Sequence, residues 1–574
     1  MRPNTRVAAL ACAAAALAAV PAQAQAGRQE PLKHTARPTT SAITPQDLRT
    51  RLYIVADDSM MGRESGTRGN VMGTDYIAAE ARRMGLQPAG ENGTFFQTVP
   101  LVNIGVENAT LSAGGQTFRA GTDFIPLPRY GTFLVFSERF NASSGVPVVY
   151  GGRIGDAASM ISPEQARGKL VVFSMGAAQQ GGPPPFAFWA GGRTFERYAE
   201  AAGIAIASLD ITPEGLRDFF GEARTEMAGK QPQARPAPAG MIVTTAVAER
   251  LLGKPLAQAQ MGEAGGTATG GFTWSTRPTP FPARNVVAVL PGSDARMRGQ
   301  YVALGAHNDH VGMTHDAVDH DSVAIFNRLL RRGGAEGEPD SMTAEIAGRL
   351  RAALDSARRV SRPRVDSIFN GADDDGSGTV GLLEIAQQMA GMSTRPRRSM
   401  LFVWHTAEEK GLFGSEYFVD HPTVNRDSIV AQLNIDMIGR GGAGDVENGG
   451  PGYLQLVGSR RLSTQMGDLV EEVNRTGSHG FTFDYSMDAT GHEAQIYCRS
   501  DHANYARYNI PVTFFTTGGH PDYHMLTDEP QYIDYEKMAR VARFVSALGV
   551  QIANRDARLT VDKPGPGPQA PCRQ

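Results

Sequence analysis

The stretch LFVWHTAEEKGLFGS, residues Leu401–Ser415, decides the fold. Largely apolar residues, of the β-branched and aromatic kinds that suit a buried strand, lead directly into two adjacent glutamates and a glycine. In an extended segment Glu408 and Glu409 point to opposite sides, so one can bind a metal ion while the other faces a water molecule. An isolated Glu-Glu pair is typical of a solvated helix start. The rest of the chain therefore decides between these interpretations.

Length and composition limit the class of protein. The chain has 574 residues, too many for one hydrophobic core, so we expect two or more domains. Hydrophobic residues make up 41% and charged residues 20%, with a net charge of −3. This is a globular composition without the basic excess that nucleic-acid binding favours.

The N-terminus, residues 1–26, is typical of a secretory signal peptide. Arg2 and Arg6 precede an apolar run, Val7–Val20, and small residues then allow cleavage after Ala24 or Ala26. The run is shorter than the roughly 20 residues that a membrane span needs. We expect an exported protein, periplasmic or secreted, with no membrane anchor after cleavage.

The chain has three cysteines, and Cys12 leaves with the signal peptide. An oxidising compartment permits a bridge between Cys498 and Cys572. The proline- and glycine-rich tail around Cys572, residues 557–574, has the composition of a flexible segment, which disfavours the bridge.

The first half of the chain contains no cluster of candidate catalytic or metal-binding residues. Residues 27–43 are typical of a linker, and a helix is predicted to follow with Thr44 as its N-cap and Pro45 in its first position. Residues 44–130 form the N-terminal part of the predicted catalytic domain. Residues 131–275 contain short strand candidates between glycine- and proline-rich turns, which indicates an inserted β-rich domain.

Histidine is concentrated in the second half: eleven of the twelve lie between His307 and His524. Apolar strand candidates in ARNVVAVLPG, QYVALGAHND, VAQLNIDMIGR and IPVTFFTTGGH alternate with helical segments, which indicates an α/β fold with a sheet buried on both faces. The last three, like the opening stretch, end with His, Asp or Glu. Since sites in such sheets form at the carboxyl ends of the strands, we expect these side chains to meet.

Five positions have the chemistry of metal ligands: His307, Asp374, Glu409, Asp436 and His524. Imidazoles and carboxylates are ligands of Zn²⁺ in catalytic sites, and a carboxylate that bridges two ions lets five side chains hold a pair. Three carboxylates and one hydroxide also match the charge of two divalent ions. Asp309 lies on the same face of an extended segment as His307 and could orient its imidazole. Glu408 would be the general base.

Other motif interpretations fail. The acidic turn GADDDGSG suggests a calcium loop, but a register with Gly376 in sixth position places Gly371 first and Leu382 twelfth, where acidic residues are required. His492 in HEAQI lacks the second histidine of a zinc helix. The sequence has neither a GxSxG nucleophile elbow nor a Walker loop.

AHNDHVG, NGADDDGSGTVGLLE, AEEKGLFGS, NIDMIG, and SDH followed by DYH occur in this order between about residues 284 and 550. Together they resemble the signature set of the M28 family of di-zinc metallopeptidases, which includes bacterial secreted aminopeptidases and glutamate carboxypeptidases. The resemblance implies an α/β zinc-exopeptidase fold, a mixed and mostly parallel sheet sandwiched by helices. It also implies one zinc on His307 and Asp436, another on Glu409 and His524, and Asp374 between them.

Two further segments share the resemblance. Residues 131–275 resemble the protease-associated (PA) domain that is inserted in such enzymes, from GKLVVFS and the helix before GIAIAS, and DDSMMGRESGTRGN resembles the family's N-terminal portion. The chain departs from simpler members by an extra segment, residues 314–365, with helical stretches that would form part of the substrate rim. Tyr497 matches a tyrosine that in some relatives stabilises the tetrahedral intermediate; a packed core tyrosine is the alternative.

We therefore expect a catalytic domain over residues 276–556 and a metal-dependent exopeptidase that removes N-terminal residues from peptides, with two Zn²⁺ per chain. Co²⁺ or Mn²⁺ could occupy the same ligands. The alternatives are a carboxypeptidase or dipeptidase of the same fold, a glutaminyl cyclase-like transferase, and a non-catalytic binding module. Substrate preference and oligomeric state stay open.

Overall fold

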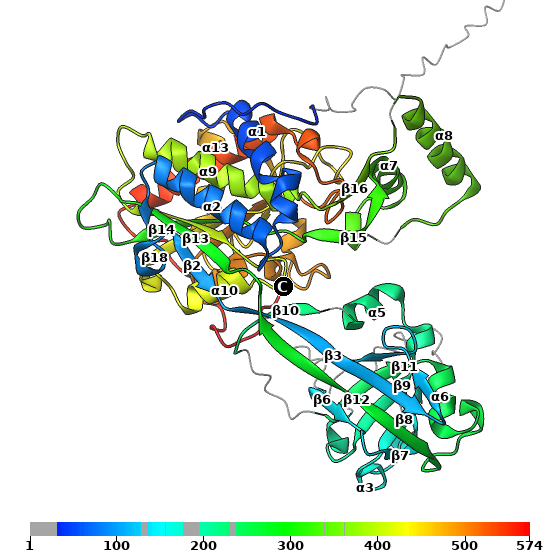
Figure 1. Ribbon diagram of the computed structural model, residues 1–574. Helices are drawn as coiled ribbons and strands as arrows, with labels where there is room; N and C mark the ends of the chain where they lie inside the picture. The colour runs from blue at the N-terminus through cyan, green and yellow to red at the C-terminus, as the bar shows by residue number, and fades with distance from the viewer. Residues whose placement is uncertain are drawn as a thin grey trace, which may run out of the picture.

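The computed structural model describes residues 31–127, 136–154, 157–175, 195–221, 223–229, 237–337, 339–360 and 362–574. Figure 1 shows a large α/β unit and a smaller β-rich unit. The expected signal peptide, residues 1–26, lies outside the described residues.

The large unit is built on a sheet with strand order β1-β13-β17-β14-β18-β21-β19-β20, in which β2 also pairs with β13. The strands are β1 (Gln87–Pro88), β2 (Phe96–Val99), β13 (Ala283–Leu290), β14 (Tyr301–His307), β17 (Ser399–His405), β18 (Ile429–Ile435), β19 (Tyr453–Val457), β20 (Thr482–Asp484) and β21 (Val512–Thr516). The four central strands, β17, β14, β18 and β21, are parallel. All residues of β17 and β18 are buried, which explains their apolar sequences.

Helices cover both faces of this sheet (Figure 1). One face packs against α1 (Pro45–Val55), α2 (Arg68–Arg83), α9 (Gly378–Ala390), α11 (Thr464–Thr476) and α13 (Tyr535–Asn554), and the other against α10 (Phe413–Asp420) and α12 (His502–Ala506). Alternate residues of β17 serve the two faces: Phe402 joins the first cluster and Val403 the second. The predicted helix start is confirmed, since the Thr44 side chain accepts the Asp47 N–H.

The β-rich unit is a sheet with the order β10-β3-β12-β7-β8-β9-β11-β5, extended by β4 and β6. Its strands are β3 (Leu101–Ala113), β4 (Gln116–Phe118), β5 (Phe124–Pro126), β6 (Arg139–Asn141), β7 (Val146–Ile154), β8 (Leu170–Met175), β9 (Gly203–Ala207), β10 (Arg224–Met227), β11 (Gly240–Val243) and β12 (Ala264–Pro278). Helices α3 (Pro163–Ala166), α5 (Glu214–Gly221) and α6 (Thr245–Leu252) accompany it.

The boundary at residue 131 differs from the structure. The β-rich unit begins at β3, because β3 pairs with β12 from Ala113↔Ala268 to Val102↔Pro278. Strands β4 and β5 also belong to this sheet. The alternating pattern of residues 101–113 indicates a strand but does not say which sheet it joins, since its partner lies far away in the sequence.

A small apolar cluster joins the two units. Leu101 of β3 is buried with Val99, Ala283, Ala407 and Phe413, and Met227 of β10 packs against them. Ala407 directly precedes Glu408, so the β-rich unit contacts the turn that carries the glutamate pair.

The extra segment after β14 forms its own substructure. It contains β15 (Met313–Asp319), α7 (His320–Leu330), α8 (Ala344–Val360) and β16 (Val365–Ile368), and β15 pairs with β16 in an antiparallel ribbon. In Figure 1 α7 and α8 stand beside the main body of the large unit. The expected helices are therefore present.

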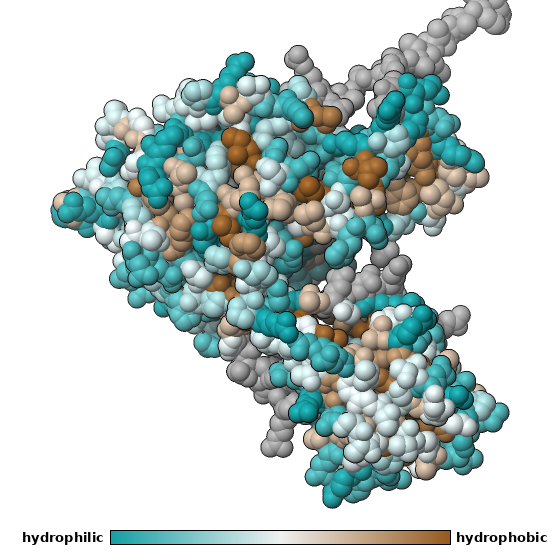
Figure 2. Space-filling view, in the orientation of Figure 1, coloured by the Kyte–Doolittle hydropathy of each residue, from teal (hydrophilic) through white to brown (hydrophobic). Residues whose placement is uncertain are grey.

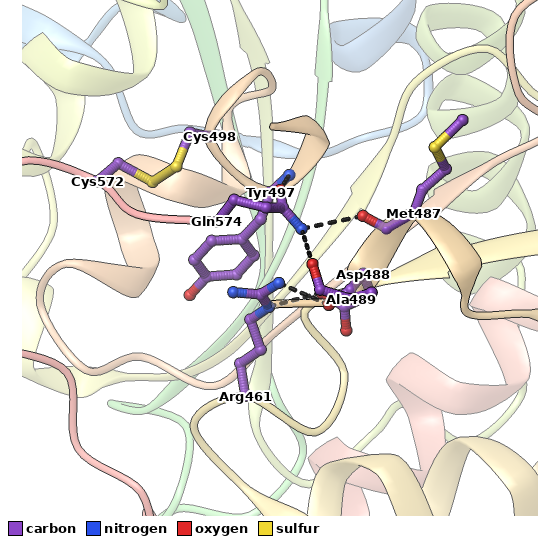
Figure 3. The surroundings of a disulfide bond; sticks show 8 residues. All are labelled: Arg461, Met487, Asp488, Ala489, Tyr497, Cys498, Cys572 and Gln574. Carbon is purple, nitrogen blue, oxygen red and sulfur yellow. Dashed lines mark hydrogen bonds and ion pairs between the residues drawn. A yellow bond between two sulfur atoms is a disulfide. The ribbon is translucent and has the colours of Figure 1, made fainter. Parts of the chain in front are cut away.

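The tail, expected to be flexible, is attached to the large unit. Cys498 and Cys572 form a disulfide, which the composition disfavoured (Figure 3). The Gln574 side chain accepts the Tyr497 N–H at 2.8 Å and donates to the carbonyl oxygens of Met487 and Ala489, each at 3.0 Å. The glycine and proline content indicates how flexible a segment is. Whether a disulfide forms depends instead on where the fold places the second cysteine.

Hydrophobic residues are scattered among hydrophilic ones on the face seen in Figure 2.

Among the residues that the structure describes, no helix combines the length and the apolar character that crossing a membrane requires.

Candidate metal centre

The candidate metal ligands meet at one edge of the main sheet. His307 is the last residue of β14, Glu409 follows β17, Asp436 follows β18, and His524 lies on the loop after β21. These four strands are parallel, so their carboxyl ends share an edge, as the sequence predicts. Asp374 comes from the turn Ala372–Ser377 that leads into α9.

His307, Asp374 and Asp436 form the first group of donor atoms, which lie within 4.8 Å of one another. The Nε2 atom of His307 lies 3.1 Å from Oδ1 of Asp374 and 3.6 Å from Oδ1 of Asp436. All three residues are buried, so the carboxylates are withdrawn from water. This group contains one imidazole and two carboxylates.

Asp374, Glu409 and His524 form a second group, together with His310. The Nε2 atom of His524 lies 2.9 Å from both Oδ2 of Asp374 and Oε2 of Glu409. The carboxylate of Asp374 therefore belongs to both groups, one oxygen facing each. This is the arrangement expected of a carboxylate that bridges two ions.

His310 is a site residue that sequence reasoning missed. Its Nδ1 lies 2.7 Å from Oε1 of Glu409, and its side chain is fully buried. Although burial alone would raise the pKa of Glu409, the contacts with His524 and His310 lower it to about 2. The signal was present in AHNDHVG, where a second histidine follows His307 by three positions.

The residues present fit a pair of metal ions. Among the described residues, none makes a hydrogen bond to the buried atoms His307 Nε2, Asp374 Oδ2 or His524 Nε2, although each faces the other donors at short distance. Buried polar atoms are normally satisfied, and a divalent cation would satisfy these. Imidazole nitrogen and carboxylate oxygen are donors that zinc takes in catalytic sites.

Glu408 lies beside the first group. Its Oε2 is 3.9 Å from His307 Nε2, and its side chain is 11% exposed. Burial raises the pKa of Glu408 well above its usual range, against the opposing effect of His307. A carboxyl group beside a donor cluster is in a position to take up and release a proton.

Asp309 contacts both His307 and Glu408. The Nδ1 atom of His307 lies 3.2 Å from the backbone oxygen of Asp309 and 3.7 Å from its carboxylate. The carboxylate accepts the backbone N–H of Glu408 at 3.1 Å. We predicted that the Asp309 carboxylate orients the His307 imidazole. The backbone oxygen of Asp309 lies closer to this imidazole than the carboxylate does, so the backbone oxygen is the main support.

Asp375 joins the loops that carry two of the ligands. Its carboxylate accepts the backbone N–H groups of His307 at 2.9 Å, Met437 at 3.1 Å and Gly378 at 2.9 Å. Met437 directly follows Asp436. Sequence reasoning missed this role, although the DDD run signals an unusual buried acidic turn.

A segment near the N-terminus, Gly62–Asn70, braces three ligand loops. The buried guanidinium of Arg63 donates to the carbonyl oxygens of Val55, Asn370 and Gly371 at 2.7–2.9 Å. Ser65 Oγ accepts the Ala407 N–H at 2.8 Å, beside the glutamate pair. The side chain of Asn70 donates to that of Asn308, next to His307, at 2.8 Å. The sequence places this segment against the catalytic domain but does not reveal these contacts.

Tyr497 lies in a packed environment. Its ring stacks under the Arg461 guanidinium at 4.2 Å and meets His502 edge-on, with 5.5 Å between ring centroids. Arg461 in turn donates to Asp488 (Figure 3). These contacts are those of a core tyrosine, and the role of Tyr497 toward a reaction intermediate stays a prediction.

A protein-family model matches the region that contains this site, and the chain is similar to several known proteins. The model of peptidase family M28 matches residues 285–549. "Leucine aminopeptidase 1" of Coccidioides posadasii is 31% identical over 198 residues, which cover 32% of this chain and 47% of that protein. "Leupeptin-inactivating enzyme 1" of Streptomyces exfoliatus is 30% identical over 151 residues, 26% of this chain and 30% of that protein.

Among solved structures, the aminopeptidase from Aneurinibacillus sp. strain AM-1 aligns over 90% of this chain and 96% of its own, with a TM-score of 0.47 and 17% identity. The chain spans less than half the length of these two curated relatives. The model of peptidase family M28 matches residues 285–549, which contain all five predicted ligands and Glu408.

Proposed function

We propose that this protein is a zinc-dependent aminopeptidase that removes N-terminal residues from peptides. One observation carries the proposal: two groups of imidazole and carboxylate donors share Asp374, with Glu408 beside them. The M28 model match and the relatives named leucine aminopeptidase support the same activity. His307 and Asp436 would hold one ion, Glu409 and His524 the other, and Asp374 would bridge.

When bound, the metal pair supplies Lewis-acid activation of the peptide carbonyl and of the attacking water. Glu408 takes the proton from that water and returns it to the leaving amine. The position of Glu408, 3.9 Å from His307 Nε2, suits both steps, because one carboxylate can accept the proton and then donate it. Asp309 fixes the turn through the Glu408 N–H, so the carboxylate stays oriented.

The pairing of cations near the site favours a free amine over a free carboxylate as the group recognised. Two cations on neighbouring loops are already paired: Lys410 with Glu64 at 2.8 Å, and Arg440 with Asp445 and Asp522 at 2.8 and 2.9 Å. A carboxypeptidase would need such a cation for the substrate carboxylate.

We further propose that the β-rich unit is a PA domain that shapes access to the site. Leu101 and Met227 support this role, because they pack into the cluster that contains Ala407, one residue before Glu408. Export to the periplasm or medium stays part of the proposal, on the N-terminal sequence alone.

Hydrolysis of matched peptides tests the proposal. Aminoacyl-arylamides with a free amine should be cleaved, and the same compounds with an acetylated amine should not. Cleavage from the carboxyl end of a blocked peptide would replace the aminopeptidase with a carboxypeptidase. Cyclisation of an N-terminal glutamine peptide would point to the transferase. A metal-loaded protein without any of these activities would leave a binding module.

A further inference from the structure

The extra segment between His310 and Asp374 starts and ends at ligand-bearing loops. At its base β15 pairs with β16, from Met313↔Ile368 to Asp319↔Val365. The Phe369 N–H donates to the Gly312 oxygen at 3.0 Å, which closes the ribbon two residues after His310. We call residues 313–368 the insertion.

The middle of the insertion contacts the loop that carries His524. The Ala335 N–H donates to the backbone oxygen of Tyr523 at 2.9 Å. Gly334 has a φ of +58°, and a Cβ there would lie 2.5 Å from the same oxygen. Only glycine permits this approach. The insertion therefore touches the residue that directly precedes His524.

An ion pair between half-buried Arg364 and buried Glu529 makes the second contact. Arg364 donates through Nη1 to Oε1 of Glu529 at 2.7 Å and through Nη2 to Oε2 at 2.5 Å, a bidentate pair. His320, on α7, places Nε2 2.7 Å from Oε2 of the same carboxylate. The side chains of Glu529 and His320 are 7% and 1% exposed. Two residues of the insertion thus hold one carboxylate of the His524 loop.

The loop needs support from both sides. On the core side Asp522 pairs with Arg440 at 2.9 Å, and Asp528 accepts the backbone N–H of Asp374 at 3.0 Å. His524 itself has a φ of +54°, in the left-handed region that is unfavourable for a residue with a side chain. Such a conformation persists only where the surroundings fix it.

We propose that the insertion is a positioning element for the second metal: Glu529, held by Arg364 and His320, fixes the loop that presents His524. This inference rests on the proposed metal-binding role of His524. Arg364, His320 and Glu529 are positioning residues, since they act through the loop and not on a substrate. The role differs from the substrate rim that the sequence led us to expect, and the two are compatible.

Metal affinities of three arginine variants test the proposal. Arg364→Met removes the pair with Glu529, and Arg364→Lys keeps its charge. Arg358→Met is the matched control, because Arg358 pairs with Asp319 and Asp321 inside the insertion. Chelator competition with Zn²⁺ measures the two affinities, and Co²⁺ absorption spectra report the ligand geometry of each ion.

We expect Arg364→Met to lower the affinity for one of the two ions by about 10- to 100-fold, the usual effect of losing a group that orients a metal ligand. The other affinity should stay within about twofold of wild type, a difference too small to assign to a lost contact. Arg364→Lys should recover most of the loss, and Arg358→Met should leave both affinities unchanged. Glu529→Gln, which has the same shape, should resemble Arg364→Met, and the double variant should lose no more than either.

Three results would overturn the inference. Arg364→Met could weaken the binding of both ions equally, Arg358→Met could weaken metal binding as much as Arg364→Met does, or neither Arg364→Met nor Glu529→Gln could change the affinities. Circular dichroism and thermal unfolding without metal establish that each variant folds. If the wild-type protein binds no metal pair, the proposed function fails first, and the two failures are thereby distinguished.

Discussion

The carboxylate of Asp309 accepts the backbone N–H of Glu408 at 3.1 Å. This bond helps to tie the turn after β17 to the end of β14, which carries His307. Asp309→Ala should therefore lower kcat by about 10- to 100-fold, because the turn that orients Glu408 loses the hydrogen bond at Glu408 itself. Asp309→Asn keeps an oxygen that can accept the N–H and should recover much of the rate. Equal rates for Asp309→Ala and wild type, in steady-state kinetics, would contradict this role.

Glu408→Gln tests the base directly. The substitution keeps the size of the side chain but removes proton transfer, so kcat should fall by about 10²- to 10⁴-fold. Metal content should stay at the wild-type level, because Glu408 is not in either donor group. Mass spectrometry of the purified variant checks the metal. A variant with wild-type kcat would exclude Glu408 as the base.

Arg63→Met should destabilise the protein and loosen the site. Its guanidinium is buried and satisfies three carbonyl oxygens, two of them in the turn before Asp374. Leaving buried acceptors unpaired costs about 1–3 kcal/mol each, so we expect a loss of several kcal/mol in urea unfolding. Arg68→Met, an exposed change in the same segment, is the control. Similar unfolding midpoints for the two variants would argue against a supporting role of Arg63.

The disulfide between Cys498 and Cys572 should contribute about 2–4 kcal/mol, because it closes a loop with a sequence separation of 74. Cys572→Ser combined with Cys498→Ser should lower the thermal midpoint. Dithiothreitol should have the same effect on the wild-type protein and none on the double variant. An unchanged midpoint after complete reduction, verified by thiol titration, would show that the tail is held by its hydrogen bonds alone.

Acid sensitivity should come in part from His502. Burial lowers its pKa to about 3, since its ring is stacked on Phe514 with 4.9 Å between centroids. A folded-state pKa below the usual value of about 6.5 gives stability that is complete above pH 6.5 and is lost as the pH falls toward 3. Between pH 7 and 4.5 the wild-type protein should lose about 2–3 kcal/mol more than His502→Phe. Urea unfolding with a chelator present measures this, and parallel pH profiles would refute it.

Part of the site could be predicted because it depends on strand ends. His307, Glu409, Asp436 and the His524 loop all follow apolar strands, and parallel strands bring their carboxyl ends to one edge. The buried strands themselves are visible as continuous apolar runs, so the α/β class followed from composition and pattern.

The rest could not be predicted because it depends on backbone contacts and distant pairing. Arg63 and Asp375 act by holding backbone carbonyl and N–H groups, which no side-chain pattern reveals. The early start of the β-rich unit depends on the pairing of β3 with β12, far apart in the chain. The disulfide depends on where the tail docks. His310 is visible in the sequence as a second histidine after His307, but its contact with Glu409 depends on the pairing of β14 with β17.

The central claim is that Asp374 joins two metal sites, and zinc content tests it most directly. Mass spectrometry of the dialysed wild-type protein should give two zinc ions per chain. His307→Ala and His524→Ala should each retain one zinc ion, because each histidine belongs to a different donor group. A single zinc in the wild-type protein, or complete loss from one variant with none from the other, would contradict the shared centre.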